Sequence, residues 1–529
     1  MSEGPTTNTY DELPYSGGAY AYSHPDRLAV VARLFGMTPA PLAGCRVLEL
    51  GCATGANLIA MAAAMPDATF VGLDNSPRQV ADGRARIAEL GLANIELREA
   101  DIATAGASLP VFDYIIAHGV FSWIPPPVQE ALLALIGAHL SAQGVAFVSY
   151  NTYPGWRMRG TIRDVMMYHA RQFQGATTQV QQARAVLDFI AQSALAEDSP
   201  YARQFKADVE ELRGQSDSYL YHEFLEPVNI PLYFHQFVER AQRHGLQYLG
   251  ESEFSTMMPH HLPPQVAQTL QKIAPDLVRV EQYMDFLRNR PFRQTLLVHR
   301  DLALQRQFGG REIADMELAS PLRAAQPPVD ERSDAKVEYV APNALKLAAS
   351  APITKAALSV LALRWPQSLP FRELCAEARS RLLVAPTAAP DPVQAARDAE
   401  VLGPEFLRIA AAGLAELRMR HVPFTLQVRE RPLAWPVARR DAVDGNNVTN
   451  LRHEVVRLDE FNRQLLLRLD GTRDRTALAA ELADLVATGV LAINQEGGSV
   501  TEPVAVRAVI TKAIDDSLVV LARVALFPE

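Results

Sequence analysis

A glycine-rich turn between an apolar run and an alanine-rich segment is the feature that most constrains the fold. Val47, Leu48 and Leu50 form the apolar run, as expected for a central parallel strand that is buried on both faces. Gly51 and Gly55 follow, and residues 57–65 then have strong helix propensity. A strand, a glycine turn and a helix in this order are typical of the first half of a nucleotide-binding βαβ unit.

Two carboxylates frame this turn. A second strand is predicted over residues 69–73 and ends on Asp74. An acidic residue there, roughly 25 residues beyond Glu49, can accept hydrogen bonds from both hydroxyls of a ribose. Glycines in the turn let the backbone approach the ligand closely, since they carry no Cβ. The turn alone is a weak signal, but together with Glu49 and Asp74 it predicts a nucleotide-type cofactor site.

The turn also discriminates between cofactors. A dinucleotide fingerprint places three glycines at the helix N-terminus to hold a pyrophosphate. Here Ala53 stands at the middle position, and Glu49 comes just before the turn. A carboxylate suits the cationic methionine end of S-adenosylmethionine better than a pyrophosphate. The pattern resembles the class I methyltransferase signature, and the alternative is a Rossmann-like domain that binds NAD or no ligand.

Two later segments match the same signature. Residues 99–102 look like the loop in which an aspartate reads the adenine amine, and residues 112–119 look like the fourth strand and its active-site end. The predicted cofactor-binding residues are Glu49, Gly51, Ala53, Gly55, Asn57, Asp74, Asn75, Asp101, Ile102, Ala117 and His118.

The remaining strands predict an α/β fold, a Rossmann-like seven-stranded class I methyltransferase domain over residues 46–303. The predicted strands are residues 145–150, 246–249 and 293–300. Two helical insertions interrupt this pattern, a first insertion at 151–230 and a second insertion at 255–290. Both follow the carboxyl ends of strands, where they would cap the cofactor crevice and recognise the substrate.

The flanking parts are predicted as separate pieces. Residues 1–45 would form an N-terminal lid and a first helix, and the Pro-rich, charged stretch within 304–336 a linker. Residues 337–430 and 431–529 are each predicted as a winged-helix-like α+β domain. The first has a helix face at Phe371, Leu374, Cys375 and Ala378, a helix at 406–417 and a strand at 422–428. In the second, Asp459 would cap a helix.

The composition of the chain indicates which kinds of partner to expect. The 529 residues carry a formal net charge of −9, and positive and negative residues nearly cancel beyond residue 331. Nucleic acid binding needs a basic face, so none is expected, and the winged helices are expected to dock a protein, with a structural or dimerising role as the alternative. Cys45, Cys52 and Cys375 lack paired spacing, so neither a disulfide framework nor a metal site is expected. No secretory signal or membrane span is recognised, and the cytoplasm is the expected compartment.

Several longer runs together resemble one bacterial family. They are YDELPYSGGAYAYSHPDRLAVVARLFG, LELGCATGANL, AHGVFSWIP, YNTYPGW and EQYMDFLRNRPFRQTLLVHR. They are similar to bacterial protein-lysine methyltransferases that act on outer-membrane proteins, over most of residues 10–300 and more loosely over 330–529. The resemblance implies a methyltransferase regulatory region at about 215–300 and a winged-helix C-terminal part. It also implies S-adenosyl-L-methionine as cofactor and a protein substrate, such as an outer-membrane or surface protein before export.

The chemistry of lysine methylation selects candidate residues near the strand ends. A lysine amine has a pKa near 10.4, so a slot of low polarity that disfavours its charged form would help. Aromatic walls can hold the cation and exclude water. The predicted catalytic residues are His118, Tyr153 and Trp156. The predicted substrate-binding residues are Tyr15, Tyr20, Trp123, Tyr219, His222 and Glu223.

Each candidate has a plainer interpretation. The aromatic residues can simply pack, His118 can line the cofactor pocket through its backbone, and Glu223 can be an ordinary carboxylate on a helix surface. The alternative function is methylation of a small molecule or a peptide natural product. A non-catalytic partner subunit is disfavoured by the intact cofactor motifs.

Overall fold

The structure, a computed structural model, describes Leu13 and residues 17–194, 199–257, 263–383, 391–492, 494–495, 498–499 and 503–529. The chain divides into two compact units. The first unit combines the described residues of Met1–Gly17, Met37–Ile59 and Asp67–Leu304. The second combines Gly18–Gly36, Ala60–Pro66 and Gln305–Glu529.

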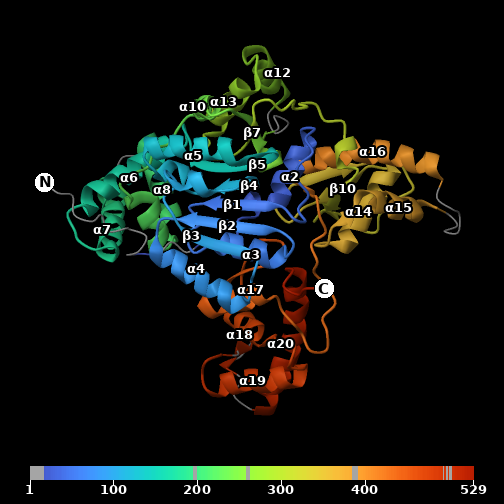
Figure 1. Cartoon of the computed structure of the whole chain (residues 1–529). Helices are drawn as coiled ribbons and strands as arrows, with labels where there is room; N and C mark the ends of the chain where they lie inside the picture. The colour runs from blue at the N-terminus through green and yellow to red at the C-terminus, as the bar shows by residue number, and fades with distance from the viewer. Residues whose placement is uncertain are drawn as a thin grey trace. The chain divides into compact units, whose positions relative to one another are not determined.

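The first unit is built on a seven-stranded sheet with the order β3-β2-β1-β4-β5-β7-β6 (Figure 1). Its strands are β1 Arg46–Leu50, β2 Thr69–Asp74, β3 Ile95–Glu99, β4 Phe112–Ala117, β5 Leu140–Asn151, β6 Leu246–Glu251 and β7 Phe292–His299. The strands from β3 to β5 are parallel, and β7 runs antiparallel to both β5 and β6. The predicted fold class is confirmed. The strand order reverses between β1 and β4, which is where open α/β sheets bind ligands.

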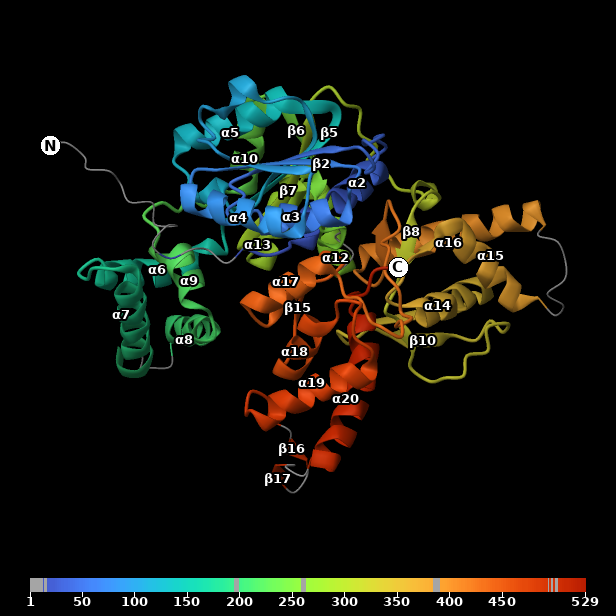
Figure 2. The ribbon, with the colours of Figure 1, turned by 60° about the horizontal axis from the view of Figure 1, so that its bottom comes forward.

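Helices cover both faces of this sheet. Figure 2 shows α5 (Pro126–His139) and α10 (Phe234–Arg243) on one face and α4 (Pro77–Leu90) on the other. The core on the α5 face joins Leu48 and Ile115 of the strands to Leu132 of α5 and Phe237 of α10, all fully buried. Because helices cover both faces of the sheet, this core is closed to water, and the strand positions in it carry apolar side chains. Short helical turns, η2 (Ala105–Ser108) and η3 (Phe121–Trp123), flank β4.

The first insertion is helical, as predicted, and has a hydrophobic core of its own. It comprises α6 Trp156–Ala170, α7 Ala176–Phe189, α8 Pro200–Arg213 and α9 Asp217–Leu220, with π-helical turns η4 Ile190–Ala194 and η5 Tyr221–Leu225. Ile162, Val180, Phe205 and Phe224 lie in that core. In Figure 1 these helices gather beside one end of the sheet.

The second insertion consists of α11 (Phe254–Met257), α12 (Pro264–Ile273) and α13 (Leu277–Arg288). Asp276 caps α13 by accepting the amide proton of Arg279 at 2.9 Å. Arg293 on β7 fixes α13 to the sheet and is fully buried. Its guanidinium donates to Glu251 on β6 and to Glu281 and Asp285 on α13, at 2.7 to 3.0 Å.

The second unit contains two small sheets with three helices in its first half. β8 (Glu317–Ala319) pairs with β12 (Leu369–Pro370) and β13 (Glu416–Arg418), and β10 (Val337–Val340) pairs with β9 (Arg323–Ala324) and β11 (Lys346–Ala349). The helices are α14 Pro352–Arg364, α15 Phe371–Leu382 and α16 Pro392–Ala411. The predicted face of α15 is buried at all four positions. The stretch predicted as a linker includes β8, β9 and the turn η7 (Arg311–Ile313), so it belongs to this fold.

Two predictions in this half are wrong. The predicted helix at 406–417 ends at Ala411, because Gly413 takes a φ of +71° and the Leu414 amide donates back to Ile409 at 3.0 Å. The strand that follows is β13, and no strand covers residues 422–428. Pro423 has no amide proton to contribute to a ladder there.

The second half of this unit contains α17 Pro436–Asp444, β14 Asn447–Thr449, β15 Val455–Arg457, α18 Glu460–Arg468, α19 Arg475–Ala487, β16 Asn494–Gln495, β17 Gly498–Ser499 and α20 Pro503–Arg523. Asp459 caps α18 by accepting the Asn462 amide proton at 2.7 Å, as predicted. No helix among the described residues is long and apolar enough to cross a bilayer.

The helix predicted with the N-terminal lid, α2 (Pro25–Leu34), belongs to the second unit together with the turn η1 (Ala21–Ser23). Its apolar face is buried at Leu28 and Val31. The Asp26 carboxylate accepts the amide proton of Met419 at 2.6 Å. These contacts explain why the segment 1–45 is divided between the units.

Candidate cofactor and acceptor site

Neither glycine of the turn after β1 has room for a side chain. Gly51 and Gly55 have φ values of +69° and +71°. A Cβ on Gly51 would lie 2.3 Å from Val120 Cγ2, and one on Gly55 would lie 2.8 Å from Leu97 Cδ1. Both the left-handed conformation and the close packing therefore require glycine. The turn brings its backbone to the carboxyl end of the sheet, beside the loop that follows β4.

Asp74 holds this turn from the neighbouring strand. Its Oδ2 accepts the Ala53 amide proton at 2.7 Å, and its Oδ1 accepts that of Ser76 at 2.9 Å. Ala53 has a φ of +51°, a conformation that L-residues adopt at some energetic cost. A carboxylate at the end of the second strand is the group expected to accept the ribose hydroxyls of the cofactor. The departure from glycine at Ala53 is thus accommodated by a backbone contact to Asp74.

Glu49 is the most unusual group of the site. It is 3% exposed, and its Oε1 accepts a hydrogen bond from the Asn57 amide at 2.8 Å. Its Oε2 is buried and receives no hydrogen bond from the part of the chain that the structure describes. Burial, together with the nearby Asp74, raises the pKa of Glu49 to about 8 despite the Asn57 contact. A buried acid with one oxygen lacking a donor fits a cationic ligand group, such as the ammonium of S-adenosylmethionine.

The predicted adenine end lies at the same edge of the sheet. Asp101 is exposed after β3, and its Oδ1 accepts the Ala103 amide proton at 2.9 Å. Ile102 is half-buried and packs against the main core of the unit. Asn75 is exposed immediately after Asp74. Their roles at the adenine end stay predictions.

The end of β4 lies beside β5. Ala117 is fully buried, and the Gly119 amide donates to Ser149 Oγ of β5 at 2.8 Å. His118 is half-buried, and burial lowers its pKa to about 4, so the ring is neutral at pH 7. An imidazole with this pKa is a weak base for a lysine ammonium. The position of His118 therefore favours lining of the pocket over proton transfer.

Four aromatic rings form a row from the β4 loop into the first insertion. The centroid distances are 6.4 Å for Trp123–Trp156, 6.2 Å for Trp156–Phe224 and 6.4 Å for Phe224–Tyr219. The structure thus brings together three of the predicted site residues, which are 33 to 96 positions apart in the chain. Trp156 is 2% exposed and packs behind Trp123, which is half-buried. Trp123 is therefore the better placed of the two to touch a substrate.

Two polar residues adjoin members of this row: Glu223 precedes Phe224, and Asn151 is bonded to Ser122, which precedes Trp123. Glu223 lies in η5, is half-buried, and has its pKa raised by burial to about 7. Asn151, at the end of β5, is 3% exposed; its Nδ2 donates to Asn229 Oδ1 at 3.1 Å and its amide to Ser122 Oγ at 2.9 Å. None of the described residues donates to Asn151 Oδ1. Asn151 is not among the residues predicted from the sequence, although a polar residue directly after a buried strand was the available signal.

The other predicted residues lie elsewhere. The Tyr153 ring contacts Tyr233 at 5.3 Å and the Arg157 guanidinium at 4.1 Å. Tyr20 belongs to the second unit, where its ring lies 5.8 Å from Tyr22. Tyr15 lies outside the described residues. No group of three or more His, Cys, Asp or Glu side chains in the described ranges is arranged to hold a metal ion.

His222 serves a structural contact instead of the predicted contact with substrate. It is 4% exposed, and both of its ring nitrogens are engaged within the protein. Nε2 lies 2.5 Å from the Leu13 carbonyl oxygen, and Nδ1 lies 3.0 Å from Glu226. A side chain buried in this way fixes the N-terminal segment at Leu13 to the first insertion and has no free nitrogen for a substrate.

Three family models match the chain. Residues 47–144 match a methyltransferase domain, residues 216–299 a "predicted methyltransferase regulatory domain", and residues 430–526 the "PKMT, C-terminal winged helix domain". The middle match contains β6 and β7. The region named regulatory therefore supplies two strands of the catalytic sheet.

Two relatives and one solved structure match long stretches of the chain. An uncharacterized protein of Rickettsia prowazekii is 33% identical over 93% of this chain and 88% of its own length. A second from the same organism is 36% identical over 46% of this chain and 96% of its own length. The solved structure of PKMT2 from Rickettsia typhi in complex with AdoHcy has 29% identity and a TM-score of 0.85, covering 97% of this chain and all of that one. The cofactor of this fold is S-adenosylmethionine, and the chain belongs to the PKMT family of S-adenosylmethionine-dependent methyltransferases.

Proposed function

We propose that the protein is a protein-lysine N-methyltransferase. The observation that carries this proposal is the aromatic row from Trp123 to Tyr219, which has the half-buried Glu223 carboxylate beside it. Aromatic faces and a carboxylate together suit an ammonium group on a flexible aliphatic chain. The name of the related PKMT2 and its complex with AdoHcy, the demethylated cofactor, support the same reaction.

The reaction is an in-line displacement. The neutral lysine nitrogen attacks the methyl carbon, the carbon–sulfur bond breaks, and the bonding electrons return to sulfur, which loses its positive charge. The nitrogen becomes a methylammonium and releases its proton afterwards. The protein's part is to bind both reactants and hold them in line. Glu49, Asp74 and Asp101 would hold the ammonium, ribose and adenine of the cofactor.

Two side chains are assigned to the amine. Asn151 Oδ1 would accept one N–H of the lysine amine and so fix the direction of its lone pair. The amide is suited to this because its Nδ2 is already held by Asn229. Glu223 would attract the lysine as an ammonium and accept its proton before transfer, for which a pKa of about 7 is favourable. Trp123 would form the wall of the channel.

The substrate is proposed to be a protein destined for the outer membrane or cell surface, methylated in the cytoplasm before export. This follows from the family resemblance. The winged-helix part at residues 430–526 is proposed to dock that substrate, since charged residues of both signs nearly cancel in the C-terminal region and no nucleic acid partner is expected.

Transfer of a deuterated methyl group to a cell lysate tests the proposal. Proteins and small molecules are separated, and the protein fraction is hydrolysed and analysed for methyl-lysine by mass spectrometry. We expect label in Nε-methyl-lysine, and strongly reduced label with Glu49→Gln when S-adenosylmethionine is not saturating. Label confined to small molecules or peptide products would replace the proposal with the alternative function. Label on protein side chains other than lysine would agree with a methyltransferase that acts on proteins but would reject lysine as the acceptor.

A further inference from the structure

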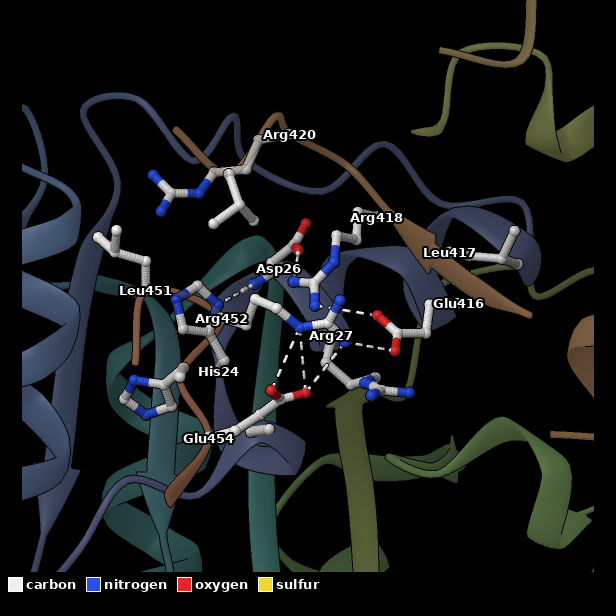
Figure 3. A pocket seen from close by; sticks show the side chains of 13 residues that line it. His24, Asp26, Arg27, Glu416, Leu417, Arg418, Arg420, Leu451, Arg452 and Glu454 are labelled. Atoms are coloured by element: carbon white, nitrogen blue, oxygen red, sulfur yellow. Dashed lines mark hydrogen bonds and ion pairs between the residues drawn. The ribbon is translucent and has the colours of Figure 1, made fainter. Parts of the chain in front are cut away.

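A charged pocket in the second unit is not used by the methyl transfer described above (Figure 3). Three segments line it: the start of α2, residues 416–422 around β13, and the turn between β14 and β15. All of its lining residues belong to the second unit. The cavity measures about 30 Å³, which is room for about two water-sized groups.

The lining carries an excess of positive charge. Arg27, Arg418, Arg420 and Arg452 face the carboxylates of Asp26, Glu416 and Glu454, so four cations meet three anions. The carboxylates are already engaged. Arg452 pairs with Glu416 at 2.6 Å and with Glu454 at 3.1 Å, and Arg418 lies 3.1 Å from Glu416 and 3.5 Å from Asp26. Figure 3 shows these side chains converging from the three segments.

Burial and the nearby arginines together shift the pKa values of the neighbouring groups. Burial and the surrounding arginines lower the pKa of His453 to about 3. Burial also lowers the pKa of His24, and His453 and three arginines add to that effect. Although burial by itself raises the pKa of Glu416, Arg452 and Arg418 reverse the effect and hold it at about 2. Both histidines are therefore neutral at pH 7, and the lining residues keep one net positive charge.

His24 adds a hydrogen-bond donor to this lining. It is 8% exposed, and its Nδ1 accepts the Asp26 amide proton at 3.1 Å as the N-cap of α2. A neutral ring that accepts at Nδ1 carries its proton on Nε2. No residue in the described part of the chain accepts that proton. The positive end of the α2 helix dipole lies at the same place.

We propose that this pocket binds a small oxyanion, either a phosphate or a carboxylate group. The His24 Nε2–H would donate to the anion, and the arginine lining would neutralise it. Guanidinium groups match both kinds of oxyanion through paired N–H donors. The cavity has room for about two oxygens of an anion, so the small anions inorganic phosphate and acetate are the appropriate probes. The site is independent of the proposed acceptor chemistry.

Equilibrium dialysis of the full-length protein with radiolabelled phosphate tests this site directly. AdoHcy is present at saturation so that the cofactor site is filled, and ionic strength is kept constant with chloride. We expect saturable binding of one phosphate per chain that an equal concentration of extra chloride does not displace. If acetate displaces the bound phosphate, the site is a general oxyanion site. If acetate does not displace it, the site is specific for phosphate. If phosphate does not bind, radiolabelled acetate is dialysed in the same way. Binding of acetate alone would assign the site to carboxylates, and saturable binding of neither anion would overturn the proposal.

Two variants locate the binding. His24→Asn keeps an N-cap acceptor for α2 but removes the donor, and Arg420→Gln removes one cation from a half-buried position. Each should weaken anion binding about tenfold or more. His169→Asn in the first unit and Arg408→Gln on the exposed side of α16 are the matched controls and should bind as the wild type does. Unchanged binding in both pocket variants would overturn the site. If one variant fails to fold, the other gives the answer.

Discussion

The Asn57 side-chain amide donates to Glu49 Oε1 at 2.8 Å, while Glu49 Oε2 is buried with no donor from the described residues. The two residues come from the β1 strand and from α3 (Ala56–Ala64), on either side of the glycine turn. The contact fixes the carboxylate so that one oxygen stays available. We infer that this oxygen receives the ammonium of the cofactor's methionine end.

Glu49→Gln should therefore weaken binding of S-adenosylmethionine by about 10- to 150-fold, since a hydrogen bond to a charged partner contributes about 1.5–3 kcal/mol. The glutamine keeps the shape and its contact with Asn57. Calorimetric titration with S-adenosylmethionine and AdoHcy measures the effect. Glu96→Gln on the exposed edge of β3 is the control and should change nothing. Equal affinity of Glu49→Gln and the wild type would remove Glu49 from the cofactor site.

The raised pKa of Glu49 predicts a pH dependence of cofactor binding. With a folded pKa of about 8, the free protein carries this proton at pH 7. Binding of a cation requires the ionised carboxylate, so binding should release about one proton at pH 7 and tighten as pH rises towards 8. Titrations in buffers of different ionisation enthalpy count the proton. Proton release that persists in Glu49→Gln would assign it to another group.

The same shift predicts how the stability of the free protein varies with pH. The folded pKa lies above the ordinary value of 4.5, so the folded state binds more protons than the unfolded state between these two values. This contribution to the free energy of unfolding is fully present below about pH 4.5 and is lost as pH rises through 8. Chemical unfolding at several pH values should show that loss for the wild type and a smaller one for Glu49→Gln.

Gly51→Ala should destabilise the protein by about 2 kcal/mol or more, because the new Cβ would meet Val120 Cγ2 and φ is +69°. Val120→Ala removes the clashing atom but not the backbone strain. In the double variant, part of the loss should be recovered, which unfolding by denaturant measures. If Val120→Ala recovers nothing, strain alone accounts for the requirement for glycine at this position.

Glu223→Gln should raise the KM for the protein substrate about tenfold or more and leave cofactor affinity unchanged. The wild-type pH profile should carry an inflection near 7, where Glu223 ionises, and the variant should lose it. Glu223→Asp should recover part of the activity. Glu210→Gln on the exposed face of α8 is the matched control. A variant that keeps the inflection would show that Glu223 does not titrate in the reaction.

Arg293→Met should cost about 3–5 kcal/mol of stability, because Glu251, Glu281 and Asp285 would remain buried without their cation. Denaturant unfolding measures the loss. Arg300→Met, on an exposed residue just after β7, should have little effect. An equally small effect at Arg293 would mean that the second insertion does not depend on this cluster.

The cofactor half of the site is determined by local sequence. The strand from Arg46, the glycine turn and the acid at Asp74 are contiguous or regularly spaced, and short-range backbone geometry then brings them to one sheet edge. The seven-stranded class I methyltransferase fold could also be expected from the sequence, since its signature motifs imply that fold and most of its buried strands read as apolar runs. Gly51 could be identified from the sequence as part of the cofactor turn, because only glycine fits where the packing leaves no room for a Cβ.

Only tertiary structure determined the acceptor half. The row from Trp123 to Tyr219 joins residues nearly a hundred positions apart, and no spacing rule predicts which aromatic side chains meet. For the same reason Asn151 was not predicted from the sequence. His222 was predicted to contact the substrate, but it contacts Leu13, which is 209 residues away in the chain. Long-range packing also places α2 in the second unit, through the contact between Asp26 and Met419. Local propensity determines where helices and strands form, whereas long-range packing decides which polar groups are buried, and burial sets the pKa of Glu49 and Glu223.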